Sequence, residues 1–174
     1  MINNQWYIVL ESKEVKKKAV GVIRFGERLI FYRDISGKIH CLFDQCAHRG
    51  AKLSFGKVIG DVVQCPFHGL EFDKDGKCVK IPANGNNTPV DGRFKVKSYP
   101  VYENFGWIWV YYSKENSSPC DLPEYFNNID NSLAAYTWKK NWKMHYSRCI
   151  ENQLDVSHVP FVHYNTIGRG FRTL

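Results

Sequence analysis

The sequence predicts a mainly β protein, an antiparallel sandwich or barrel, followed by a short helical segment. Short runs of β-branched and aromatic residues recur along residues 6–112. Turn-forming residues separate these runs at intervals of about eight to twelve residues, which is typical of antiparallel all-β domains. Past residue 141 the apolar side chains instead return every four residues, as along one face of a helix.

The predicted strands are short and follow one another closely. Gly26-Glu27, Ser36-Gly37 and the segment from Asp73 to Gly76 supply turns between neighbours. The predicted strands cover residues 6–10, 20–25, 29–32, 39–43, 58–64, 70–72, 78–81, 94–96 and 107–112.

The predicted helix begins after Asn141, a residue type that often caps helix N-termini. Its apolar stripe consists of Trp142, Tyr146, Ile150 and Leu154. Pro160 is expected to end or kink the helix, because proline lacks an amide hydrogen and clashes with the preceding turn.

Composition places the chain among ordinary globular proteins. Apolar residues make up 44% and charged residues 24%, which argues against disorder and against a fibrous repeat. No stretch approaches the roughly 20 apolar residues of a membrane span, so we expect a cytoplasmic protein. The net charge of +7 fits either a solvated surface or the docking of an acidic electron donor. Nucleic acid is less favoured as a partner, because no nucleic-acid motif accompanies the charge.

Two short loops each carry one cysteine and one histidine. Cys46 and His48 are separated by one residue, Cys65 and His68 by two, and sixteen residues lie between His48 and Cys65. Thiolate and imidazole ligands suit tetrahedral zinc or an iron–sulfur cluster in which histidines replace two cysteines. A cysteine and a histidine one residue apart can hardly reach a single ion, whereas they can reach two different irons. The spacing therefore favours a [2Fe–2S] cluster over zinc.

This pattern resembles the Rieske signature, and the resemblance extends over about residues 6–112. It implies an antiparallel Rieske-type sandwich with a cluster-binding loop subdomain. Cys46 and Cys65 would bind the buried iron, and His48 and His68 the outer one. Respiratory Rieske proteins carry an extra cysteine in each loop, but Ala51 and Phe67 stand at the matching places here. No serine follows Gly69 either, so we expect a potential at the low end of the Rieske range, around −150 mV.

A second group of possible ligands lies near the C-terminal end. Asp155 and His158 are three residues apart and would share a helix face, and Pro160 would let the chain return His163 toward His158. Two histidines and a carboxylate are the ligand set of non-haem iron(II) sites with open positions. On spacing alone, two ordinary surface or core histidines remain the simpler alternative.

The order of the two groups is similar to that in Rieske non-haem iron oxygenases of the ring-hydroxylating and demethylating type. The resemblance implies that His158 and His163 bind a mononuclear iron, that Asp155 links this iron to a cluster, and that Asn152 lines the site. The third iron ligand of that family is a carboxylate far downstream, and no Asp or Glu follows Asp155 here. We therefore expect a truncated catalytic domain and a chain that is inactive alone.

The predicted organisation is a Rieske domain at residues 1–115, a linker at 116–140 and the N-terminal fragment of a catalytic domain at 141–174. The expected partners are a ferredoxin or flavin reductase as electron donor, a small organic substrate and O2, with a homotrimer for the whole protein. Two alternatives remain open: a complete Rieske-type ferredoxin with a helical tail, and a zinc-stapled interaction module.

Overall fold

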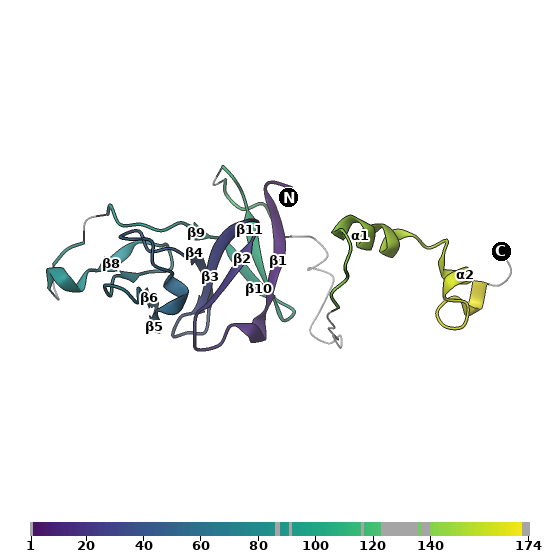
Figure 1. Cartoon of the computed structure of the whole chain (residues 1–174), viewed down its shortest axis with the longest axis horizontal. Helices are drawn as coiled ribbons and strands as arrows, with labels where there is room; N and C mark the ends of the chain where they lie inside the picture. Colours follow the sequence, from purple (N-terminus) through teal and green to yellow (C-terminus); the bar gives the residue numbers. More distant parts are fainter. Residues whose placement is uncertain are drawn as a thin grey trace. The chain divides into compact units, whose positions relative to one another are not determined.

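The computed structural model describes residues 2–85, 88–90, 92–115, 117–122, 136 and 140–171. The chain divides into two compact units, residues 1–133 and 134–174. The first unit is built from antiparallel strands, which confirms the predicted fold class, and the second contains short helices (Figure 1). Most of the predicted linker lies outside the described residues.

Three small sheets make up the first unit. The first has the order β1-β11-β10, formed by Gln5–Glu11, Trp107–Tyr112 and Val101–Asn104. The second has the order β2-β3-β4-β9, formed by Val20–Arg24, Glu27–Arg33, Ile39–Phe43 and Ser98–Tyr99. The third has the order β5-β6-β7-β8, formed by Lys57–Ile59, Val62–Gln64, Glu71–Phe72 and Cys78–Lys80.

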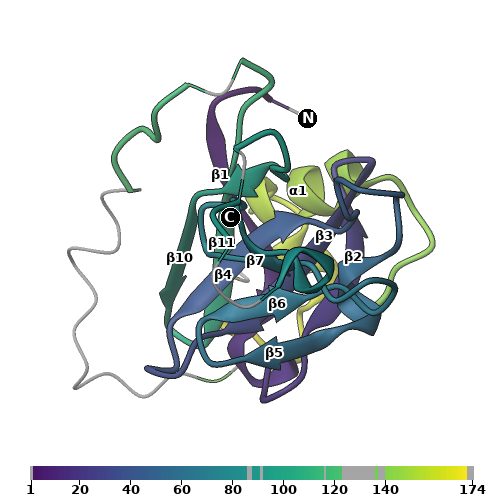
Figure 2. The same ribbon diagram turned by 90° about the vertical axis from the view of Figure 1, so that its left-hand side faces the viewer.

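Strand β3 lies between two hydrophobic cores. Leu29 and Phe31 pack into one core with residues of β1 and β11, whereas Ile30 and Tyr32 pack into the other with residues of β6 and β7. All four side chains are fully buried, which explains why the strand reads as a continuous apolar run instead of an alternating one. Figure 2, which looks from the β5–β8 side, shows β5 and β6 in front of β3 and β4. The core that contains Ile30 and Tyr32 also contains Cys46 and Cys65, so it lies directly beneath the loops that carry these cysteines.

Two strand predictions need correction. The run at residues 58–64 forms two strands, because Gly60 adopts a positive φ of 58° and turns the chain between them. The run at 94–96 is no strand: Lys95 makes only an isolated bridge with Lys77, and the neighbouring strand is β9. The sequence also missed β10, which pairs with β11.

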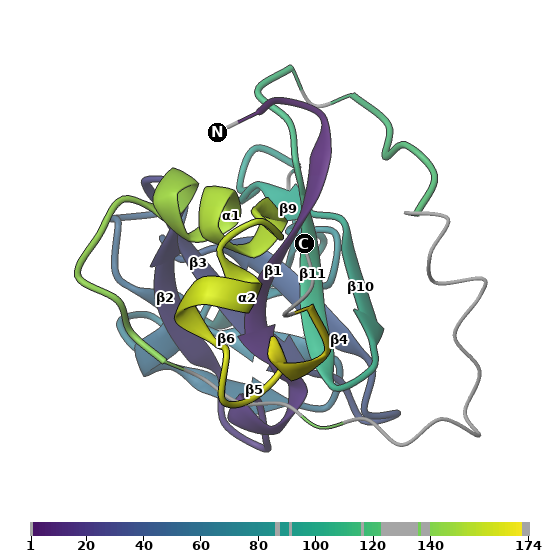
Figure 3. The same cartoon turned by 90° about the vertical axis from the view of Figure 1, so that its right-hand side faces the viewer.

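The described part of the second unit contains two separate α-helices, α1 at Tyr146–Leu154 and α2 at Val159–Val162, and a 3-10 helix at Arg169–Phe171 (Figure 3). The N-cap of α1 is His145 and not Asn141, because the His145 ring accepts a hydrogen bond from the Ser147 amide. Pro160 does not end α1; it lies in the first turn of α2, where its missing amide hydrogen costs nothing. Among the described helices none is long and apolar enough to span a membrane.

Candidate metal centre

The two Cys-His loops share one backbone design. The amide of each cysteine donates to the carbonyl five residues ahead, from Cys46 to Ala51 at 2.8 Å and from Cys65 to Leu70 at 2.7 Å. Each cysteine carbonyl in turn accepts from the amide of a glycine, Gly50 in the first loop and Gly69 in the second. Both glycines have a φ of +73°, a conformation that favours glycine. The two cysteines therefore occupy equivalent backbone positions, whereas His48 follows its cysteine by two residues and His68 by three.

The four side chains sort into a buried pair and an exposed pair. Cys46 and Cys65 are each only 3% exposed and belong to the core that also contains Leu53 and Val63. His48 and His68 are exposed, and their ring centroids lie 4.7 Å apart. Two sulfur ligands inside and two imidazoles outside match a cluster with one sulfur-bound and one histidine-bound iron.

Burial raises the pKa of the Cys46 thiol to about 11. A thiolate in this position therefore needs a positive charge beside it, because desolvation penalises the ionised form. Iron in a cluster would supply that charge, so the residues present fit the cofactor. Among the described residues, no three His, Cys, Asp or Glu side chains converge closely enough for a single metal ion.

Aromatic side chains flank both histidines. The ring of Phe94 meets His48 edge-on at 6.2 Å, and the ring of Phe67 lies 4.1 Å from that of His68. Phe67 is 62% exposed. These contacts restrict the imidazole orientations and place apolar surface next to the exposed ligands.

Sequence reasoning missed a buried pair that closes the first loop. One carboxylate oxygen of Asp44 accepts from the Ser54 amide at 2.7 Å, and the other accepts from the Ser54 hydroxyl at 2.6 Å. Asp44 is only 4% exposed, and its own amide donates to the Arg28 carbonyl. The pair ties both ends of the segment carrying Cys46 and His48 together. In the sequence, the signal for this pair was an aspartate two residues before Cys46, and its burial could not be seen there.

In the second unit, Asp155, His158 and His163 lie close together, but Asp155 and His158 do not share a helix. Asp155 is the C-cap of α1 with a ψ of 105°, and His158 is the N-cap of α2, so the helical-face prediction is wrong. The rings of His158 and His163 are 5.4 Å apart. Asn152, on α1, is exposed.

The turn between α1 and α2 brings Asp155 back to His158. Asp155 Oδ1 accepts from the Ser157 amide at 2.9 Å and from the Ser157 hydroxyl at 2.5 Å. These bonds lower the pKa of Asp155, so the carboxylate is charged at neutral pH. Asp155 Oδ2 lies 3.4 Å from the buried Nδ1 of His158, which has no hydrogen bond within the described residues. The carboxylate thus faces one ring nitrogen and leaves Nε2 available.

Comparisons with known proteins match both parts of the chain. A family model described as the Rieske [2Fe-2S] domain matches residues 5–100, and a model of the vanillate O-demethylase oxygenase C-terminal domain matches residues 142–173. Chlorophyllide a oxygenase of Chlamydomonas reinhardtii is 35% identical over 172 residues, which are 98% of this chain and 26% of that protein.

Solved structures give the same picture. Dicamba monooxygenase bound to dicamba has a TM-score of 0.76 and 30% identity, over 92% of this chain and 48% of that one. A second structure, dicamba monooxygenase with non-heme iron and dicamba, has a TM-score of 0.65 and 33% identity, over 75% and 39%. The chain spans about a quarter to a half of the length of the first curated relatives it matches.

Proposed function

Because this chain belongs to the Rieske [2Fe-2S] family, we propose that it is the electron-accepting part of an oxygen-activating non-haem iron oxygenase. The observation that carries the proposal is the pair of matched loops, with two buried cysteines and two exposed histidines. When bound, a Rieske cluster supplies reversible one-electron chemistry. The match of residues 142–173 to an oxygenase catalytic domain favours this function over a stand-alone ferredoxin.

Each ligand would have its own task. The Cys46 and Cys65 thiolates would anchor the cluster in the core, away from water. His48 and His68 would bind at the surface, where their rings shorten the distance over which an electron passes to or from another protein. Phe67 and Phe94 would keep these rings in place.

In the whole protein, we propose that His158 and His163 bind the mononuclear iron through Nε2. Asp155 would accept a hydrogen bond from His158 Nδ1, the arrangement that orients metal-bound histidines. Its position facing His158 supports a link between the two metal centres, in which the other carboxylate oxygen would meet the cluster ligand His68 of a neighbouring subunit in a homotrimer. The boundaries at residues 115 and 141 and a cytoplasmic location are part of the same proposal.

The whole protein would hydroxylate or demethylate a small organic, aromatic or cyclic, substrate with O2. Its electrons would come from a ferredoxin or a flavin reductase. Dicamba and vanillate demethylases among the relatives support the substrate class.

The cluster is the part of the proposal that can be tested on this chain directly. The purified, reconstituted protein should be red-brown and contain about two irons and two sulfides per chain. Cys46→Ser should abolish the cluster, whereas Cys78→Ser is a matched control, because Cys78 is buried in the same core but lies outside the two loops. A colourless protein that retains zinc would refute the proposal.

His68→Cys gives a second readout. It should keep the iron but lower the reduction potential, because a charged thiolate stabilises the oxidised cluster more than a neutral imidazole does. An unchanged potential would show that His68 is not a ligand.

A further inference from the structure

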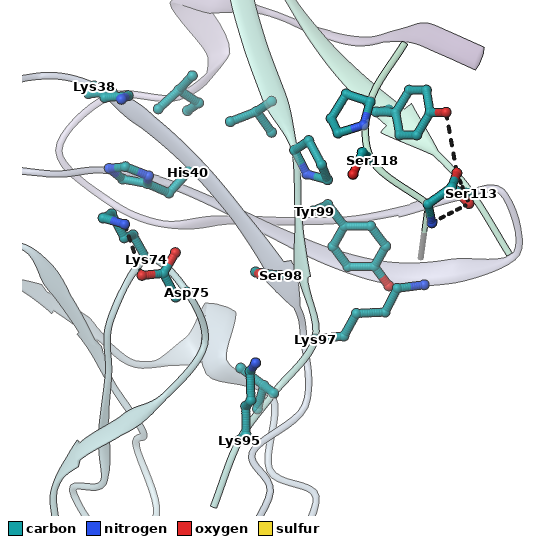
Figure 4. A pocket seen from close by; sticks show the side chains of 17 residues that line it. Lys38, His40, Lys74, Asp75, Lys95, Lys97, Ser98, Tyr99, Ser113 and Ser118 are labelled. Carbon is teal, nitrogen blue, oxygen red and sulfur yellow. Dashed lines mark hydrogen bonds and ion pairs between the residues drawn. The ribbon is translucent and has the colours of Figure 1, made fainter. Parts of the chain in front are cut away.

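The segment from Lys95 to Lys97 separates two hollows on the surface of the first unit. Val96 is buried at 5% exposure, while Lys95 is exposed. One hollow, about 830 Å³, is lined by Lys38 and Lys74 besides this segment (Figure 4). The other, about 520 Å³, is lined by the segment together with the first cluster loop, including His48 and Arg49.

Positive charge dominates both hollows. The larger one contains four lysines and a single acidic residue, Asp75, which pairs with Lys74 at 2.9 Å. The smaller one contains no acidic residue. Lys97 is held by Glu27 at 3.7 Å and lies over the Tyr99 ring. Lys38 and Lys95, by contrast, make no ion pair with any residue that the structure describes.

Lys95 and Arg49 line the same hollow as His48, a proposed cluster ligand. We call Lys38, Lys74, Lys95 and Arg49 the Lys95 surface. It extends from the larger hollow across the segment to Arg49 beside His48, so its field reaches the place where an electron would enter. Lys38, Lys74 and Lys95 line the larger hollow, and the positive surface continues past Lys95 into the smaller hollow with Arg49, so it is not confined to one anion-sized site. The distribution suits an extended acidic partner.

We propose that the Lys95 surface docks an acidic one-electron donor, a small iron–sulfur protein or domain whose reduced centre is surrounded by carboxylates. This inference rests on the proposed function and names the face that the donor uses. One electron leaves the donor's reduced centre and reduces the Rieske cluster, with no bond formed or broken and no proton transferred. Complementary charges speed such encounters by roughly 10- to 1000-fold, and salt weakens the effect.

The test compares two triple charge reversals in the cluster-loaded chain. Lys38→Glu/Lys74→Glu/Lys95→Glu changes the Lys95 surface. Lys16→Glu/Lys17→Glu/Lys18→Glu is the matched control, because it reverses three exposed lysines that line neither hollow and alters the net charge equally. Stopped-flow absorbance follows cluster reduction by a reduced plant-type [2Fe–2S] ferredoxin, which is acidic, and separately by dithionite.

At low ionic strength the first variant should be reduced by the ferredoxin at least about tenfold more slowly, and its rate should lose most of its salt dependence. The control should stay within about twofold of the wild type. Dithionite in excess should reduce the cluster completely in all three proteins. Lys38→Gln/Lys95→Gln removes two charges without adding new ones, so it should slow cluster reduction by the ferredoxin to a smaller extent. This variant replaces the triple reversal if the latter does not fold.

Equal slowing of both triple variants would overturn the docking site, because net charge would then explain the effect. An unchanged rate in the first variant would overturn it too. So would inhibition of the wild type by inorganic phosphate beyond that by chloride at matched ionic strength, since this would indicate a small-anion site. Failure of dithionite to reduce a cluster in the wild type would instead contradict the proposed function.

Discussion

At the scale of single residues, Asp44 is the side chain that connects the first cluster loop to the rest of the fold. It is buried, accepts two hydrogen bonds from Ser54, and precedes Cys46 by two positions. The backbone of β2 comes close to this pair: a Cβ on Gly21 would lie 2.6 Å from the Ser54 oxygen and 3.0 Å from Asp44 Oδ2. The pair is therefore packed closely against β2 on one side, while it also lines a hollow of about 450 Å³ with Arg28 and Phe55.

Asp44→Ala should lower the free energy of unfolding by about 1–3 kcal/mol, because the half-buried Ser54 amide and hydroxyl lose a charged acceptor. The loop should also hold its cluster less firmly, so the visible absorbance should fade faster in the presence of an iron chelator. Urea unfolding and chelator kinetics measure the two effects.

Asp44→Asn should recover part of both losses, because its amide oxygen can still accept from the Ser54 backbone. Asp75→Ala removes an exposed carboxylate and is the control; it should change neither quantity. Cluster loss in Asp44→Ala at the wild-type rate would show that the pair only stabilises the fold.

At the scale of elements, the turn between β7 and β8 supports the segment that carries Lys95. Gly76 has a φ of +76°, and its carbonyl accepts from the Val96 amide at 2.8 Å. A Cβ on Gly76 would lie 2.1 Å from the Val96 carbonyl oxygen, so the two backbones can approach only because no side chain intervenes.

Gly76→Ala should therefore destabilise the protein more than Gly26→Ala. Gly26, in the turn between β2 and β3, has nearly the same φ of +77° but open space around its Cβ position. Gly26→Ala should cost only the backbone strain, about 1–2 kcal/mol, and Gly76→Ala should add the displacement of residue 96. Urea unfolding of both variants gives the comparison, and equal losses would mean that the segment can move aside.

The same elements show how far sequence reasoning reaches. Strands β4 and β11 were predicted with their observed bounds, because apolar runs and turn residues are local signals. The run at residues 94–96 has a suitable composition, yet it bonds only to the first residue of β8 and to the turn before it, so no ladder extends along it. Whether such a run forms a strand depends on which distant segments lie beside it, and the local sequence does not show this. The start of α1 was misplaced because the histidine ring acts as its cap.

The candidate sites also combine features that the local sequence predicts with features that only tertiary contacts create. The spacing of Cys46, His48, Cys65 and His68 suffices to predict a two-loop cluster site, because each loop is local. The Asp44–Ser54 pair and the gathering of Lys38, Lys74 and Lys95 depend on tertiary contacts that a sequence without homologues does not reveal. The net charge of +7 suggested an acidic donor, but only the structure indicates a face for it.

At the scale of the whole molecule, the two units hold different numbers of ligands for their proposed metals. The first unit supplies all four cluster ligands, whereas the second supplies two imidazoles and one carboxylate that is already engaged. Asp155 accepts two bonds from Ser157 with one oxygen and faces His158 with the other. A direct iron ligand that keeps this turn would have to be Oδ2, the oxygen that faces His158.

The 174-residue chain should therefore bind no third iron tightly. Two neutral imidazoles give a divalent iron neither enough ligands nor a compensating negative charge. Anaerobic calorimetric titration of the cluster-loaded chain with iron(II) should give weak binding, nearly the same in the wild type and in His158→Ala/His163→Ala. Tight binding of one iron that disappears in the double variant would contradict this. Asp155→Asn would then decide the ligand set: loss of that iron would make Asp155 a ligand, whereas retention would leave it facing the Nδ1 of an iron-bound His158.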